Sequence, residues 1–230
     1  MPRGSSAGRE SKQTRMSETR FYPFRLASRQ LVKTFYEDVW AELPDDPEPW
    51  EWERRRAILL REAWRGERVL DLGCGAGRFM RALRAEGAHP VGVDIAEGAL
   101  ERARRNVPGA ELHLLGPDGA IPLEDSSIDV VWCSEVLEHV PDTAALLSEI
   151  RRVLVTRGTL LVTTPSHELP RRVLIALLRW EEHFDPLGQH VRFYSRRSMT
   201  RTLETFAFED IEVSSQRGML VARARKARLF

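Results

Sequence analysis

Three glycines at alternate positions, Gly73, Gly75 and Gly77, follow directly after a short apolar run that also contains Asp71. Glycine lets the backbone come close to a ligand, and the start of the helix expected next offers free N–H groups. The spacing differs from the dinucleotide fingerprint G-x-G-x-x-G, because the third glycine comes one residue early. The loop, which includes Cys74, therefore predicts a ligand site of another kind.

A second acid, Asp94, closes the next apolar run. A carboxylate at this place can accept hydrogen bonds from both ribose hydroxyls of an adenosine moiety, because its two oxygens match two vicinal donors. The alternative is a helix N-cap before Ile95, which is a common use of aspartate. The pairing of an acid with the glycine loop favours the ligand role and places Ile95 beside the same ligand.

Hydroxyl and titratable side chains follow a third apolar run, at Ser134, Glu135, Glu138 and His139. Ligands in open parallel sheets bind outside the carboxyl ends of the strands, so this cluster is expected to face one. Glu135 and His139 are candidate catalytic residues, and His190 is a further candidate base in a later loop. We assign no metal ligands, because a hard cation takes several oxygens and only two carboxylates are present.

Strands and helices alternate around these residues, a pattern typical of an α/β fold whose parallel sheet is covered on both faces. The tight turn at residues 216–218 predicts an antiparallel hairpin at the sheet edge. The expected strands cover residues 69–72, 90–94, 111–115, 128–133, 158–164, 210–214 and 219–224. The expected helices within the sheet region cover residues 95–106, 143–154 and 197–206.

Segments outside this alternation complete the chain. Residues 1–20 are rich in Ser, Arg and Gly and are expected to be a disordered extension, and residues 21–230 to form a single domain. Two helices precede the first strand, and an insertion at about 165–197 contains an apolar helix with arginines at 171–180. Such a helix serves as a cap or dimer face, or makes peripheral contact with a membrane or a lipid-like substrate.

The pattern Asp-x-Gly-x-Gly-x-Gly resembles the first motif of class I S-adenosylmethionine-dependent methyltransferases. The resemblance implies a Rossmann-like, seven-stranded, mostly parallel sheet. It also implies S-adenosylmethionine as cofactor, with Asp71 at its methionine end, Asp94 on its ribose, and Ser134 and Asp118 nearby. In this family an acid after the third strand bonds the adenine. Here Pro117 occupies its usual place and Asp118 comes one residue later.

The stretch Leu137-Glu138-His139-Val140 is similar to a segment of many class I enzymes, and most of all to ubiquinone-biosynthesis O-methyltransferases. In those enzymes the Glu-x-x-Glu-His pattern, here Glu135, Glu138 and His139, is associated with a divalent metal near the acceptor hydroxyl. The resemblance therefore implies O-methylation of a small-molecule or lipid-like acceptor.

Two other functions stay open at this stage: an RNA-directed methyltransferase, and a non-catalytic protein that binds the cofactor. The net charge of +1 opposes the first, so no nucleic-acid partner is expected. Two cysteines form no disulfide framework, so the cytoplasm is the expected compartment. The oligomeric state does not follow from the sequence.

Overall fold

The computed structural model describes residues 22–116, 119–178, 180 and 190–228. They contain one seven-stranded sheet in the order β3-β2-β1-β4-β5-β7-β6. The strands are β1 (Arg68–Leu72), β2 (His89–Asp94), β3 (Glu111–Leu114), β4 (Ile128–Ser134), β5 (Leu154–Pro165), β6 (Phe208–Gln216) and β7 (Met219–Lys226). The first five strands pair in parallel, and β7 is antiparallel to both β5 and β6. The expected Rossmann-like sheet with an antiparallel edge hairpin is confirmed.

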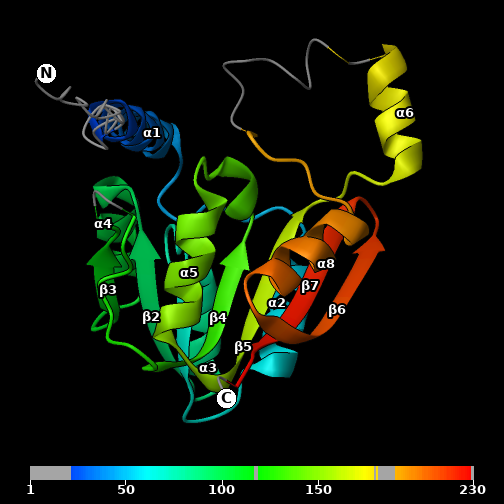
Figure 1. The fold of residues 1–230 in the computed structure, drawn as a ribbon. Helices are drawn as coiled ribbons and strands as arrows, with labels where there is room; N and C mark the ends of the chain where they lie inside the picture. Colours follow the sequence, from blue (N-terminus) through cyan, green and yellow to red (C-terminus); the bar gives the residue numbers. More distant parts are fainter. Residues whose placement is uncertain (1–21, 117–118, 179, 181–189, 229–230) are drawn as a thin grey trace, which may run out of the picture.

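Helices cover both faces of this sheet (Figure 1). They are α1 (Tyr22–Glu42), α2 (Trp52–Glu62), α3 (Arg78–Ala85), α4 (Glu97–Asn106), α5 (Thr143–Val153), α6 (Leu169–Leu178) and α8 (Arg196–Thr205), with a short 3-10 helix, η2 (Leu137–His139). α5 and α8 pack on one face, and α2, α3 and α4 on the other. α1 lies above the carboxyl ends of the neighbouring strands, against α4.

Two apolar layers join the helices to the sheet, and β1 contributes to both. Leu70 and Leu72 belong to the layer beneath α5 and α8, whereas Val69 belongs to the layer beneath α2 and α3. Side chains along a strand alternate between its faces, so Asp71 shares the side of Val69. The acid that precedes the glycines is therefore buried on the side that α2 covers.

The element boundaries differ from expectation in a few places. β5 begins at Leu154 rather than Gly158, because the chain passes from α5 straight into the strand. α4 begins at Glu97 rather than at the expected residue 95. The edge hairpin forms as predicted: Arg217 and Gly218 both have positive φ, 49° and 81°, as a two-residue type I′ turn requires.

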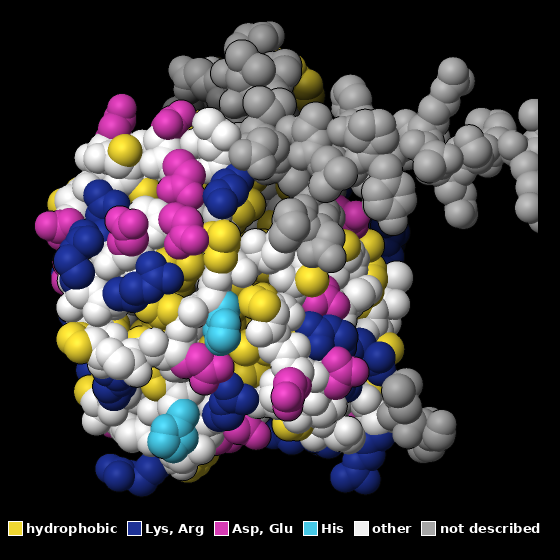
Figure 2. Space-filling view, turned by 90° about the vertical axis from the view of Figure 1, so that its left-hand side faces the viewer, with side chains coloured by type: hydrophobic (Ala, Val, Ile, Leu, Met, Phe, Trp, Pro, Cys, Tyr) yellow, Lys and Arg dark blue, Asp and Glu magenta, His cyan; other side chains and the backbone are white. Residues whose placement is uncertain are grey.

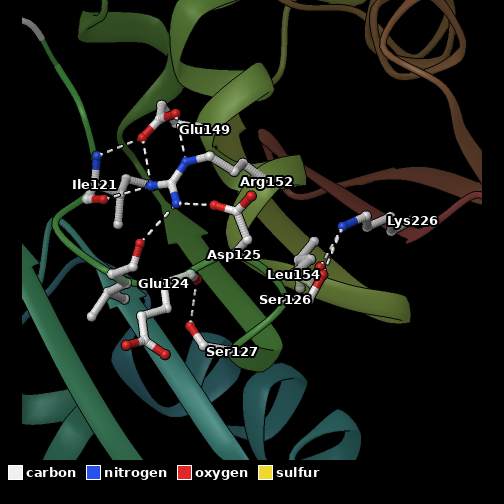
Figure 3. A network of polar contacts seen from close by, with 10 residues as sticks. Ile121, Glu124, Asp125, Ser126, Ser127, Glu149, Arg152, Leu154 and Lys226 are labelled. Carbon is white, nitrogen blue, oxygen red and sulfur yellow. Dashed lines mark hydrogen bonds and ion pairs between the residues drawn. The ribbon is translucent and has the colours of Figure 1, made fainter.

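Arg152 of α5 holds the connection between β3 and β4, in which the described residues contain no helix (Figure 3). Its guanidinium donates to the carbonyls of Ile121 and Leu123 and pairs with Asp125 and Glu149. Glu149 also accepts a hydrogen bond from the backbone N–H of Ile121. Contacts with α5 thus fix this connection at the end of the sheet opposite the glycine loop.

Several expectations fall on other parts of the chain. The extension at residues 1–20 and Asp118 lie outside the described residues. The helix expected within the 165–197 insertion is present as α6. Among the described residues, no helix combines the length and the apolar character that crossing a bilayer demands.

Candidate functional site

The glycine loop joins β1 to α3 and is shaped by bonds to the neighbouring strand. The N–H groups of Gly73 and Cys74 both donate to the carbonyl of Val93, at 2.7 and 3.1 Å. Gly73 is exposed, whereas Cys74 is buried. The N–H of Gly75 donates to Asp94 Oδ2 at 2.9 Å. These loop amides are used within the protein, so the loop offers a ligand close approach rather than hydrogen bonds.

Close packing explains why glycine stands at each of the three positions. All three have positive φ, between 53° and 84°. A Cβ on Gly73 would lie 2.6 Å from the side chain of Val136, and one on Gly77 would lie 2.9 Å from that of Val107. A larger residue would therefore be strained by its backbone and by its neighbours.

Asp94, at the carboxyl end of β2, is buried and uses both oxygens on backbone groups. Oδ2 accepts from Gly75, and Oδ1 accepts from the N–H of Ala96 at 3.0 Å. Ala96, rather than Asp94, is the N-cap of α4. Burial raises the pKa of Asp94, and the backbone hydrogen bonds partly oppose this. Each oxygen keeps one further lone pair, which is what two ribose hydroxyls need. The side chain of Ile95 beside it is half-buried.

Asp71 lies fully buried one strand away, with its Oδ2 lacking a hydrogen-bond partner among the described residues. Burial, and next the charge of Asp94, raise the pKa of Asp71 to about 7, while the guanidinium of Arg55 opposes the rise. An unsatisfied buried carboxylate is costly, so this oxygen is suited to a cationic ligand group.

Arg55 of α2 is a buried cation beside this carboxylate, and the sequence interpretation missed it. Its Nε donates to Ser134 Oγ at 2.9 Å, and its Nη1 donates to the carbonyl of Trp50 at 3.0 Å. Both acceptors are neutral. Three consecutive arginines resemble a solvated face, but Arg55 stands one helical turn before the buried Leu59, and that spacing was the available signal.

A chain of hydroxyl groups connects Arg55 to the next strand ends. Ser134 Oγ lies 2.6 Å from Thr163 Oγ1, and the Thr163 hydroxyl donates to Glu135 Oε1 at 3.0 Å. Glu135 has a positive φ of 55° although it is not glycine, and its N–H donates to the carbonyl of Thr163. The structure therefore brings Ser134 and Glu135 into one network, at the ends of β4 and β5.

Glu138 is buried in the turn η2, and neither of its carboxylate oxygens has a hydrogen-bond partner among the described residues. Nε2 of His139 lies 3.9 Å from Glu138 Oε1. Burial, and next the charge of Glu135, raise the pKa of Glu138. The acid is thus held ready for a proton or a cation.

His190 reaches this turn because its neighbours bind the backbone there. The N–H groups of Val191 and Arg192 both donate to the carbonyl of Glu138, at 2.8 and 3.0 Å. The rings of His139 and His190 are in contact, with centroids 4.8 Å apart. Burial lowers the pKa of His190, so its imidazole is mainly neutral near pH 7.

One ligand atom from each of Glu138, His139 and His190 lies within 4.8 Å of the others. A carboxylate oxygen and two imidazole nitrogens form a donor set that fits a transition-metal ion or zinc. The group differs from the pattern expected from the sequence, because His190 joins it while the Oε1 of Glu135 accepts from Thr163.

Comparison with known proteins identifies the family of the chain. The model of a methyltransferase domain matches residues 45–213. Ubiquinone biosynthesis O-methyltransferases from Idiomarina loihiensis and Hahella chejuensis are each 31% identical, over 65% and 69% of this chain. The matches take in 64% and 68% of those proteins, so the chain spans about two thirds of their length.

A solved structure shows the same fold at lower identity. The 1,6-didemethyltoxoflavin-N1-methyltransferase of Burkholderia thailandensis, solved with bound 1,6-didemethyltoxoflavin and S-adenosylhomocysteine, aligns with a TM-score of 0.61 and 18% identity. The alignment covers 94% of this chain and 93% of that one. The chain is thus a member of the class I S-adenosylmethionine-dependent methyltransferase family.

Proposed function

We propose that this enzyme transfers the methyl group of S-adenosylmethionine to a hydroxyl group of a small-molecule or lipid-like acceptor. The observation that carries the proposal is the cluster of Glu138, His139 and His190, which lies beyond the strand ends next to the glycine loop. Methylation of a hydroxyl needs a group that takes its proton, and this cluster supplies candidates. Relatives named as O-methyltransferases support the same class of acceptor.

The cofactor would lie across the ends of β1 and β2, with its charges matched by buried partners. Asp94 would accept from the two ribose hydroxyls, beside Ile95. The orphaned oxygen of Asp71 suits the amino group of the methionine portion. Arg55, whose hydrogen-bond acceptors in the described chain are neutral, suits its carboxylate. Exposed Gly73 would leave room for the chain between them.

Catalysis would depend mainly on alignment, because the sulfonium already activates the methyl group for transfer. The acceptor hydroxyl would lie beside η2, and an imidazole nitrogen of His139 or His190 would take its proton. The lowered pKa of His190 keeps this ring able to accept a proton near neutral pH. Glu135 would act on the same turn through its bond with Thr163.

A divalent metal is an alternative to the imidazole base in this proposal, because a ring nitrogen that holds a metal cannot also take the proton. Glu138, His139 and His190 would hold it, since the buried carboxylate has no hydrogen-bond partner in the described chain. A bound metal would lower the pKa of an acceptor hydroxyl. Methyl transfer with and without a chelator tests this alternative, and full activity in the chelator would remove it from the proposal.

α6 supports the lipid-like side of the proposal. Leu177 and Leu178 are 76% and 73% exposed, and Arg171 and Arg172 stand at the start of the same helix. An apolar helix flanked by arginines matches an anionic lipid surface. Sedimentation with phosphatidylglycerol vesicles, compared with phosphatidylcholine vesicles, should show preferential binding that Leu177→Glu reduces. If the protein sediments with neither kind of vesicle, the lipid-like acceptor is removed from the proposal and the small-molecule acceptor remains.

The face that carries β3 and α4 does not have the charge pattern of an RNA-binding surface. Positive and negative side chains interleave over it (Figure 2). Arg68 pairs with Glu111, and Arg105 pairs with Asp45. A large positive field is the usual mark of nucleic-acid binding, so this face gives the RNA-directed alternative no support.

The test is transfer of a labelled methyl group to a panel of phenols, catechols and prenylated phenols, with an RNA sample as a separate arm. We expect label on a hydroxyl acceptor and a loss of about 100-fold in His139→Ala or His190→Ala with retained cofactor binding. Glu101→Ala, an exposed change on α4, is the matched control. Label only on RNA, or on nitrogen, would contradict the proposal.

A further inference from the structure

One carboxylate of α1 binds the start of α4. Glu37 Oε1 accepts from the N–H of Glu97 at 2.8 Å, and its Oε2 accepts from the N–H of Gly98 at 3.1 Å. The preceding amide, that of Ala96, donates to Asp94. Two carboxylates from distant parts of the chain therefore share the first turn of α4, where the helix dipole favours negative charge.

Trp40, one turn further along α1, packs on the glycine loop. A Cβ on Gly75 would lie 2.9 Å from its ring carbons, so the indole is in contact with the loop backbone. The Arg102 guanidinium lies 5.8 Å from the centre of the same ring and also donates to the carbonyl of Leu43. The last turns of α1 are thus fastened to α4 on one side and to the loop on the other.

Tyr36 stands next to the anchoring carboxylate and reaches the catalytic turn. Its ring meets that of His139 edge to face, with centroids 6.0 Å apart. Burial, and next the charges of Glu138 and Asp94, raise the pKa of Tyr36, so its hydroxyl stays protonated. The phenol therefore lies against His139 and within range of the charges of both Glu138 and Asp94.

We propose that Glu37 is a positioning residue, which holds α1 across the cofactor pocket so that Tyr36 and Trp40 form its outer wall. The inference rests on the cofactor site proposed above. Its physical basis is that α1 contacts α4, the glycine loop and the turn that carries His139. The wall would slow the release of bound cofactor and keep water from the sulfonium.

The linker after α1 is held to α3 by ion pairs that do not involve Glu37. Asp46 pairs with both Arg78 and Arg81 of α3, at 3.1 and 2.9 Å. Loss of the Glu37 carboxylate should therefore free the helix while the linker stays in place and the domain stays folded. Glu42, an exposed acid at the end of the same helix, offers a control with the same change of charge.

The experiment compares Glu37→Ala, Glu37→Gln and Glu42→Gln with the wild type. Calorimetry with S-adenosylhomocysteine should show a Kd about tenfold higher in Glu37→Ala, the size of one lost helix cap, and a smaller rise in Glu37→Gln. The KM for S-adenosylmethionine should rise by the same factor while kcat changes far less. Hydrogen exchange of residues 32–42 should quicken, and Glu42→Gln should match the wild type.

Two results would overturn the inference in different ways. If Glu37→Ala lowers the melting temperature and quickens exchange but leaves the Kd and the KM unchanged, the carboxylate is only a structural cap. If the wild type itself does not bind S-adenosylhomocysteine, the proposed cofactor site fails, and the role of Glu37 fails with it.

Discussion

The proposed cofactor half and the proposed acceptor half of this site are built in different ways. At the ends of β1 and β2, backbone amides of the glycine loop bind the neighbouring strand end, as in the bond from Gly75 to Asp94. At the ends of β4 and β5, the site depends on contacts between loops that are far apart in the sequence. One example is the hydrogen bond from the N–H of Val191 to the carbonyl of Glu138. Local backbone geometry therefore preorganises the first half, whereas tertiary contacts between distant segments preorganise the second.

The two halves also differ in how the carboxylates of Asp94 and Glu138 are hydrogen-bonded. Asp94 has backbone partners for both carboxylate oxygens, whereas neither carboxylate oxygen of Glu138 has a hydrogen-bond partner in the described chain. A satisfied carboxylate holds a fixed geometry, and an unsatisfied one is suited to exchange a proton or take a cation. We infer that the cofactor half binds and that the acceptor half reacts. The predictions below can break or sharpen this division.

The largest effect is expected at the ribose acid. Asp94→Ala removes two charge-assisted hydrogen bonds to ribose and releases the Gly75 amide, so the Kd for S-adenosylhomocysteine should rise about 100-fold or more. Calorimetry measures it, with Glu101→Ala as control. Binding that is undiminished in Asp94→Ala would break the division, because the cofactor half would then not depend on its best-ordered acid.

A smaller loss is expected at the buried arginine. Arg55→Met removes the cation proposed for the methionine carboxylate, and the Kd should rise about 20-fold, the worth of one charged hydrogen bond. Arg54→Met is the matched control, because Arg54 bonds to Gln216 on the surface instead. If the two variants bind equally well, Arg55 only supports Ser134.

The pH profile tests the acceptor half. The folded pKa of His190 lies below the ordinary value of about 6.5, and the base is the neutral ring. The rate at saturating cofactor should therefore be flat near pH 7 and fall about tenfold per pH unit once the pH drops below that pKa. His190→Gln should remove this limb of the profile. A limb that persists unchanged in this variant would assign the base elsewhere.

The smallest effect is a proton count. Asp71 has a pKa of about 7 in the free protein, so it is mostly protonated at pH 6. A bound ammonium group would lower that pKa, and cofactor binding at pH 6 should release about 0.9 proton. Calorimetry in buffers of different ionisation enthalpy measures the release. No release in the wild type, or equal release in Asp71→Asn, would remove the amino group from Asp71.

The raised pKa of Asp71 also means that this residue destabilises the free protein at neutral and higher pH. Its folded pKa is raised above the unfolded value of about 3.9, so its charging lowers stability progressively as the pH rises from about 4 to about 7. Asp71→Asn should accordingly stabilise the free protein at pH 8 by roughly 1–3 kcal/mol. Denaturant unfolding without cofactor measures this difference.

The sequence predicts the local structure of the glycine loop, of the end of β2 and of the edge hairpin well, because the signals are local. The alternating glycines, the acid that ends β2 and the turn at residues 216–218 each lie within a few residues of the structure they specify. The acceptor half is less predictable: nothing near Glu138 says that the backbone of Val191 binds there, and nothing near Ser134 points to Arg55. Contacts between segments far apart in the chain set both, and a local pattern cannot specify them.

The most direct test of the central claim compares S-adenosylhomocysteine with its 2′-deoxy analogue on the wild type and on Asp94→Ala. If Asp94 binds the ribose, the wild type should lose about tenfold in affinity for the analogue, one charged hydrogen bond. Asp94→Ala should then bind both ligands alike, because the partner of the missing hydroxyl is already gone. An equal loss in both proteins would contradict the claim, since the hydroxyl would then be bound by another residue.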